Sequence, residues 1–150
     1  MRNKNHVILL VEDNPDDEEL TRLAFAECRI ANELVVARNG QEALDYLFAT
    51  GSYSGRNVCD QPQLILLDLK LQKVDGLDVL RRVRMSERTK LLPVAILTSS
   101  REDKDMVDSY KLGANSYIQK PVDFNQFVEV VRQLGLYWLV LNESPYACCK

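Results

Sequence analysis

Five short apolar segments recur along the chain, and stretches with a helical spacing of apolar residues separate them. The segments are too short for buried helices and too uniformly apolar for strands that have one solvated face. Strands covered on both faces have this pattern. The sequence therefore predicts the buried strands of a parallel sheet at residues 7–11, 34–37, 64–67, 93–97 and 117–118.

Helical patterns follow these segments. Asn14 fits the N-cap of the first helix and Pro15 its first residue, and acidic residues then occupy the first turn, where the helix dipole favours them. Further helices are predicted at residues 42–49, 77–85, 103–112 and 123–134. Because strands and helices alternate strictly, we expect an α/β fold with a doubly wound five-stranded parallel sheet, of the flavodoxin-like (βα)5 type.

Apolar residues at helical spacing predict which face of a helix is buried. In the first helix this stripe consists of Leu20, Leu23, Ala24 and Cys28, and in the fourth it consists of Met106, Val107 and Tyr110. Asp16 and Asp17 are interpreted as helix-dipole and capping residues, the usual role of acids at the start of a helix.

Composition excludes some functions. The chain has 150 residues, a common size for one domain, and a net charge of −3, which does not favour nucleic acid as the main partner. It has no signal-peptide pattern and no apolar stretch long enough to span a bilayer, so we expect a cytoplasmic protein without a membrane partner. Its four cysteines lack metal-site spacing and are expected to be reduced thiols.

Polar side chains stand directly after the apolar segments: Glu12 and Asp13, then Asp68, Thr98 and Lys120. The carboxyl ends of parallel strands meet at one crevice, so we expect these residues to form one site. The three acids could hold Mg2+ (or Mn2+), which prefers a few carboxylates together with water and phosphate oxygens. Asp68 could attack a phosphorus atom in line and form an aspartyl phosphate. The metal, the hydroxyl and the ammonium would neutralise the charge of the transferred group.

Each of these residues also has a structural interpretation. A strand-end aspartate such as Asp68 is often a turn residue, Thr98 alone usually caps a helix, and Tyr117 on a short strand usually packs. The joint occurrence at equivalent strand ends favours a functional site. A cis bond between Lys120 and Pro121 would aim the lysine into that site.

Five motifs resemble those of the receiver domain of two-component response regulators, and the resemblance covers residues 6–135. They are Val11-Glu12-Asp13-Asn14, Leu67-Asp68-Leu69, Val74-Asp75-Gly76-Leu77, Leu97-Thr98-Ser99 and Tyr117-Ile118-Gln119-Lys120-Pro121. The resemblance implies that Asp68 is the phosphoacceptor and Lys120 the phosphate-binding lysine. It also implies that Thr98 and Tyr117 are the switch pair.

The same resemblance implies a metal site. It makes Asp13 and Asp68 direct ligands, Glu12 a ligand through water, and the main-chain carbonyl of Lys70 a further ligand. Receivers usually have proline four residues after the phosphoacceptor, where this chain has Gln72, so we expect a less rigid loop around Lys70. We expect no enzymatic activity beyond the protein's own metal-dependent phosphorylation and dephosphorylation.

Two further features resemble the stand-alone response regulators of bacterial and cyanobacterial phytochromes: the turn-rich residues 51–62 and the aromatic-Trp-apolar segment within residues 136–145. This resemblance implies a phytochrome-type histidine kinase as phosphoryl donor and signalling by phosphorylation-dependent contacts with an unknown downstream protein. We expect residues 1–135 to form the receiver domain and residues 136–150 a C-terminal extension without a separate output domain.

The apolar segment from Leu136 to Leu141 predicts an interface, because six contiguous apolar residues cannot all be hidden on one face of an element. We expect a symmetric homodimer with Tyr137, Trp138 and Leu139 as candidate contacts and Trp138 as the anchor. The alternative is a strap that packs back on its own domain.

Other classes of protein fit less well. A phosphorelay or chemotaxis-type single-domain receiver unrelated to light stays open as an alternative. A haloacid-dehalogenase-like phosphatase needs a second acid two residues after the nucleophile, where this chain has Lys70. A flavodoxin-like electron carrier needs a hydroxyl- and glycine-rich phosphate loop, and a DNA-binding regulator needs more residues than the 16 at positions 135–150.

Overall fold

The computed structural model describes residues 7–120 and 123–141. Within them, five parallel strands form one sheet in the order β2-β1-β3-β4-β5. The strands are β1 (Val7–Val11), β2 (Glu33–Ala37), β3 (Leu64–Leu67), β4 (Val94–Thr98) and β5 (Ser116–Gln119). The predicted doubly wound α/β fold with a five-stranded parallel sheet is therefore confirmed.

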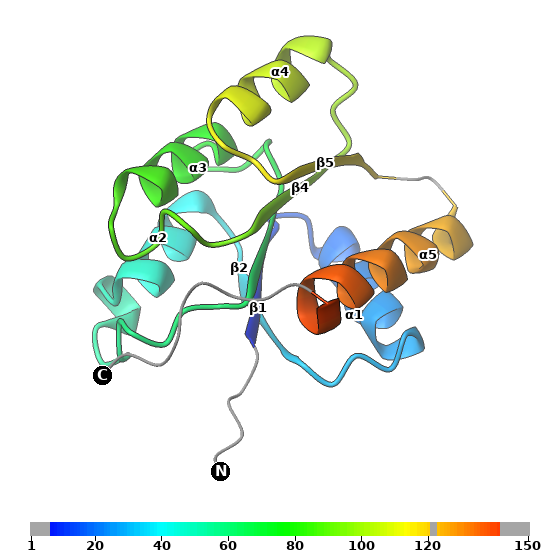
Figure 1. Cartoon of the computed structure of the whole chain (residues 1–150), viewed down its shortest axis with the longest axis horizontal. Coiled ribbons are helices and arrows are strands. Elements are labelled where there is room, and N and C mark those ends of the chain that lie inside the picture. Colours follow the sequence, from blue (N-terminus) through cyan, green and yellow to red (C-terminus); the bar gives the residue numbers. More distant parts are fainter. Residues whose placement is uncertain (1–6, 121–122, 142–150) are drawn as a thin grey trace.

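Helices cover both faces of the sheet (Figure 1). Helices α1 and α5 lie side by side on one face, and α2, α3 and α4 lie on the other. Their bounds are α1 (Pro15–Glu27), α2 (Gly40–Phe48), α3 (Gly76–Met85), α4 (Asp103–Lys111) and α5 (Phe124–Leu134). A 3-10 helix η1 (Gly51–Tyr53) follows α2, and a π-helix η2 (Gly135–Leu141) continues α5.

Alternating strand residues contribute to two apolar cores. Leu9, Ile65 and Ile96 face α2 and α3, whereas their neighbours Ile8 and Leu64 face α1 and α5. Since side chains alternate between the faces of a strand, a strand buried on both faces must be apolar at every position. This is the physical reason for the uniform apolar segments in the sequence.

The predicted buried stripe of α1 is wrong in part. Leu20 and Leu23 are 42% and 47% exposed, and Thr21, Ala24 and Phe25 are the buried residues. Thr21 can face inwards because its hydroxyl donates a hydrogen bond to the main-chain carbonyl of Asp17 at 2.8 Å, so no polar group is left unsatisfied.

The predicted buried stripe of α4 is also wrong, because a hydroxyl residue again takes the buried position. Met106, Val107 and Tyr110 are exposed, whereas Ser109 is completely buried. The Ser109 hydroxyl donates to the main-chain carbonyl of Asp105 at 2.7 Å. The inward face of α4 is therefore formed by a small residue that satisfies its own polar group, and three apolar side chains remain in contact with solvent.

Residues 51–62 pack against the end of α2. The Arg56 guanidinium lies 3.9 Å from the centre of the Tyr46 ring, and its Nε donates to the Tyr46 carbonyl at 2.9 Å. Cys28 has a free thiol. Cys59 in this segment is disulfide-bonded, so the expectation of reduced thiols is wrong for it.

One part of the C-terminal segment packs on its own domain, and another part is exposed. Trp138 and Leu139 are half-buried against the core between α1 and α5, and Gln63 Nε2 donates to both of their carbonyls at 3.3 Å. Leu136 and Tyr137 are 50% and 51% exposed. Part of the segment is therefore a strap, and part is a free apolar surface. Among the described residues, no helix is both long and apolar enough to cross a membrane.

Candidate functional site

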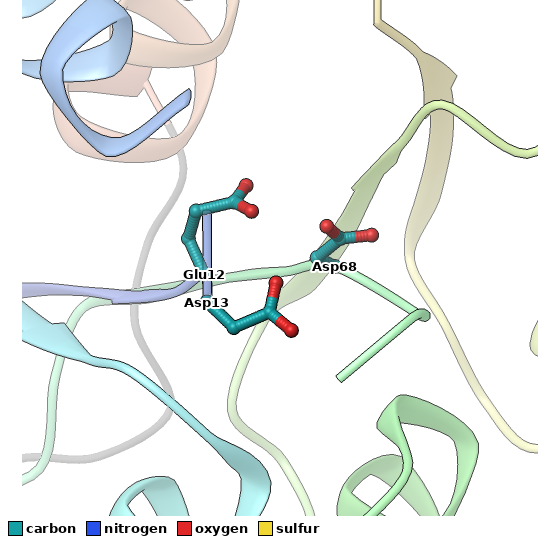
Figure 2. A group of neighbouring side chains, drawn as sticks. All are labelled: Glu12, Asp13 and Asp68. Carbon is teal, nitrogen blue, oxygen red and sulfur yellow. The ribbon is translucent and has the colours of Figure 1, made fainter. Parts of the chain in front are cut away.

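Three acids converge at the carboxyl end of the sheet. Glu12 and Asp13 follow β1 and Asp68 follows β3, and ligand oxygens of the three lie within 4.8 Å of one another (Figure 2). Glu12 and Asp68 are only 2% and 7% exposed. The predicted convergence of these side chains is thus present in the structure.

Lys120 follows β5 and brings a positive charge into this cluster. Its Nζ lies 2.6 Å from Glu12 Oε1, 3.0 Å from Asp17 Oδ2 and 3.4 Å from Asp68 Oδ2. Its main-chain N–H donates to the Thr98 carbonyl at 2.8 Å, which fixes the place where the side chain leaves the sheet. The peptide bond between Lys120 and Pro121, predicted as a cis candidate, lies outside the described residues.

The environment shifts the pKa of both partners in the shortest contact. Burial raises the pKa of Glu12 to about 7, against the opposing effect of the Lys120 ammonium. Burial alone would lower the pKa of Lys120, but the charge of Asp68 and the hydrogen bond to Glu12 outweigh it and raise the pKa. Lys120 therefore remains charged, whereas burial favours the protonated form of Glu12.

The cluster fits a divalent cation. Within the described residues, Glu12, Asp13 and Asp68 form the cluster, and Lys120 is the cation that pairs with Glu12 and Asp68, so the cluster has an excess of negative charge. Carboxylate oxygens are the ligands that hard cations such as Mg2+ and Mn2+ prefer. A bound divalent ion would remove most of the repulsion among the buried acids.

Asp17 is a site residue that the sequence interpretation missed. Asn14 is the N-cap of α1, as predicted, and its Oδ1 accepts hydrogen bonds from the main-chain N–H groups of Asp16 and Asp17 at 2.8 and 3.2 Å. The side chain of Asp17 nevertheless contacts Lys120. Helical side chains point back towards the N-terminus, so an acid in the first turn can extend over the end of β1. That geometry is the signal that could have identified it.

The loop between β3 and α3 holds the Asp68 carboxylate in place. The Lys70 main-chain N–H donates to Asp68 Oδ1 at 3.3 Å, and Gly76 donates from its main-chain N–H to the Leu69 carbonyl at 3.1 Å. A Cβ atom at position 76 would lie 2.4 Å from the Asp68 carbonyl oxygen, so this approach requires glycine. The predicted role of the Lys70 carbonyl as a metal ligand stays a prediction.

Gln72, which stands where receivers usually have proline, is held by a main-chain hydrogen bond. Its carbonyl accepts a hydrogen bond from the main-chain N–H of Gly40 at 3.3 Å. A Cβ atom on Gly40 would lie 1.9 Å from the Val74 carbonyl oxygen, so the loop rests directly on the start of α2. This packing gives the loop a contact that compensates in part for the absence of proline.

The proposed switch residues lie next to this cluster. Thr98 is completely buried at the end of β4, and its Oγ1 accepts a hydrogen bond from the main-chain N–H of Ser100 at 3.2 Å. Tyr117 of β5 packs against the core on the α2 and α3 face. Burial raises the pKa of its hydroxyl, against the opposing effect of a hydrogen bond with the Ser100 side chain.

A family model supplies the decisive observation, because it matches residues 8–132 to the response regulator receiver domain. The chain belongs to the response regulator receiver family. It is a receiver of two-component signalling, and its acidic cluster has the place and composition of the divalent metal site typical of receivers.

Several known proteins are similar to this receiver over nearly the whole chain. The probable methanogenesis regulatory protein FilR2 of Methanothrix harundinacea is 40% identical over 93% of this chain and 87% of its own length. Response regulator Rcp1 of Synechocystis is 35% identical over 97% of both chains. Its Mn2+-bound structure covers 93% of this chain and 99% of that one, with a TM-score of 0.84.

The bacteriophytochrome response regulator AtBRR is 55% identical to this receiver. Its structure has a TM-score of 0.76 and covers 94% of this chain and 100% of that one. This receiver thus resembles the phytochrome response regulators in sequence and in structure.

Replacing one acid of the receiver's metal cluster tests its assignment. Asp13→Asn removes one ligand charge, so we expect the Mg2+ affinity to fall by about tenfold, since ligand charge sets the affinity of such sites. Isothermal titration calorimetry measures this change. Asp16→Asn is a matched control, because it removes the same charge three residues away and outside the cluster. Equal losses in both variants would show that Asp13 acts only through its charge and not as a ligand.

Proposed function

We propose that this response regulator accepts a phosphoryl group on Asp68 from a histidine kinase of the phytochrome type. One observation carries the proposal: the buried Asp68 carboxylate lies at a strand end, beside two further acids and 3.4 Å from the Lys120 ammonium. The similarity to AtBRR and Rcp1 supports the phytochrome-type donor.

The transfer needs little covalent chemistry from the protein. An oxygen of Asp68 attacks the phosphorus of a phosphohistidine in line, so that an O–P bond forms and the P–N bond breaks, and the imidazole leaves. Lys120 binds an oxygen of the transferred group, and the buried Thr98 hydroxyl can turn towards another. Asp13 and Asp68, Glu12 through water and the Lys70 carbonyl would hold Mg2+ (or Mn2+), which neutralises phosphoryl charge when bound.

The signal follows from a change of packing. When Thr98 turns towards the phosphoryl group it leaves space, and the Tyr117 ring moves further inwards. This movement changes the surface formed by α4, β5 and α5, and it is a population shift driven by the different affinity of the two packings for phosphate. We infer that residues 1–135 carry this response, that residues 136–150 extend it, and that the output is a protein contact in the cytoplasm.

A comparison of phosphoryl donors tests the proposal. Purified histidine kinases of the phytochrome and chemotaxis types and a phosphorelay phosphotransferase are phosphorylated with labelled phosphate and mixed with this protein at equal concentration. We expect the phytochrome-type kinase to transfer fastest. A faster transfer from either other donor would contradict the light-linked assignment and favour the second candidate, a receiver unrelated to light. The 40% identity to FilR2, named as a methanogenesis regulator, favours that second candidate.

We also propose that the protein is a homodimer through its C-terminal segment. Leu136 and Tyr137 form the free apolar surface directly after α5. A groove of about 630 Å3 beside them, lined in part by Ile118 and Val130, offers space for an apolar side chain of a second copy. Trp138 is half-buried on its own domain, so Tyr137 is the better anchor.

A double substitution separates this dimer contact from the strap. Leu136→Ser with Tyr137→Ser removes the exposed apolar surface and leaves Trp138 and Leu139 in place. We expect the dimer dissociation constant to rise by about tenfold or more, because aromatic anchors dominate interface energetics. Analytical ultracentrifugation measures it, with Met85→Ser as the control because Met85 is 77% exposed elsewhere. A monomeric parent, or an unchanged constant in the double variant, would refute the interface.

A further inference from the structure

Asp17 contacts the site without belonging to the acidic cluster that fits a metal. Its Oδ2 lies 3.0 Å from Lys120 Nζ, whereas the cluster of converging ligand oxygens consists of Glu12, Asp13 and Asp68. We propose that Asp17 is a positioning residue, which holds the Lys120 ammonium at the phosphoryl site while Glu12 and Asp68 serve the metal. The inference rests on the proposed phosphoryl transfer to Asp68 and adds a residue to that site.

Lys120 has as many N–H donors as it has carboxylate partners. An ammonium has three N–H groups, and Lys120 has three carboxylate contacts, with Glu12, Asp17 and Asp68. A phosphoryl oxygen can bind Lys120 only by taking the place of one of them. The contact with Asp68 is the longest, at 3.4 Å, and phosphorylation turns that carboxylate into an acyl phosphate, a mixed anhydride. It is therefore the contact that the phosphoryl oxygen replaces.

The metal site distinguishes Asp17 from the other two carboxylate partners of Lys120. Glu12 and Asp68 belong to the cluster that would face a divalent ion, and their oxygens would then be shared with it or with its water. Asp17 lies outside the cluster, so its carboxylate remains available to Lys120 throughout the transfer. Without Asp17, the Lys120 ammonium would lose the partner whose carboxylate is shared neither with the metal nor with the phosphoryl group.

The start of α1 gives Asp17 a fixed position. Its main-chain N–H donates to Asn14 Oδ1 at 3.2 Å, and its carbonyl accepts from the buried Thr21 hydroxyl at 2.8 Å. The main-chain N–H of Asn14 in turn donates to Glu12 Oε2 at 3.2 Å. The first turn of α1 and the acidic cluster are therefore joined, and the Asp17 carboxylate is placed by main-chain bonds on both sides.

Asp17→Ala tests the proposal against Asp16→Ala. Both substitutions remove one negative charge from the first turn of α1, so their effects on the helix dipole and on the local field are shared. Asp16 makes no contact with Lys120 among the interactions of the described residues. We expect Asp17→Ala to slow phosphorylation by acetyl phosphate about fivefold, through loss of positioning, and Asp16→Ala to leave it unchanged or slightly faster.

A second measurement needs neither metal nor phosphate. The NMR order parameter of the Lys120 ammonium reports how firmly the side chain is held, and in the metal-free protein it should fall in Asp17→Ala but not in Asp16→Ala. In a Lys120→Ala background, Asp17→Ala should have no further effect on labelling, since the two residues act as a unit.

The results of these experiments distinguish failure of the positioning role of Asp17 from failure of the proposed phosphoryl transfer. Equal behaviour of the two aspartate variants, or an Asp17→Ala effect that persists without Lys120, would overturn the positioning role. Faster labelling of Asp17→Ala than of Asp16→Ala would also overturn it, because Asp17 would then compete with the phosphoryl group for Lys120. Failure of the parent to become labelled would refute the proposed function, whereas the metal-free order parameters would still report on Asp17 alone.

Discussion

Asp68→Asn should abolish phosphoryl transfer from the histidine kinase. The carboxamide has almost the same shape as the carboxylate but lacks the nucleophilic oxygen, so we expect a loss of about 1000-fold or more, as for other covalent nucleophiles. Labelled phosphate, followed by mass spectrometry of the modified peptide, measures the transfer and its position. Asp75→Asn is the matched control, because Asp75 is exposed in the following loop and its side chain makes no capping hydrogen bond.

The fold of the Asp68 variant should be intact. The acids of this site outnumber its ammonium, so replacing one carboxylate relieves repulsion in the absence of metal. Thermal unfolding of the metal-free variant should therefore occur at the same temperature as in the parent or slightly higher. Labelling that persists undiminished in Asp68→Asn, in a protein with a normal unfolding transition, would remove Asp68 from the role of phosphoacceptor.

The sheet and its carboxyl-end crevice could be predicted from the sequence because both depend on local patterns. A strand buried on both faces needs apolar residues at each position, as in Ile8 and Leu9 of β1, and this leaves a clear trace. Once the strands are known, the topology of parallel sheets places Glu12, Asp68 and Lys120 at one edge. The structure confirms that these residues, far apart in the chain, lie within contact distance.

Helix faces were harder to predict because a hydroxyl residue can replace an apolar one inside. Thr21 and Ser109 are buried with their hydroxyls bonded to main-chain carbonyls one turn earlier, and apolar periodicity gives no sign of this. Leu20 and Leu23 of α1 are consequently on the surface.

Asp17 illustrates a different limit of sequence patterns. An acid in the first turn of a helix is explained completely by the helix dipole, so nothing in the sequence demands a further role. Only the distance to Lys120, from a residue more than a hundred positions away, distinguishes Asp17 from Asp16. Pair contacts of this kind depend on side-chain direction at the level of single residues, which composition and spacing do not determine.

Lys120→Ala should separate phosphorylation from the response. The variant keeps Asp68, the proposed nucleophile, so it should still accept phosphate, at a rate reduced by about tenfold to 100-fold through loss of one charged contact to the transferred group. It loses the connection between the phosphoryl group and the end of β5, where Lys120 stands next to the strand that carries Tyr117. The conformational change should therefore be much smaller than in the parent.

Beryllofluoride, a stable mimic of the phosphoryl group, allows this response to be measured without a kinase. Backbone NMR shifts around Thr98 and Tyr117 should change strongly in the parent and weakly in saturated Lys120→Ala. Lys90→Ala is the control, because Lys90 pairs with Glu87 at the surface and its ammonium is 2.9 Å from that carboxylate. If the two saturated variants showed shifts as large as those of the parent, the ammonium would not couple the phosphoryl group to the switch. The signal would then have to pass through another group, such as the buried hydroxyl of Thr98 at the end of β4.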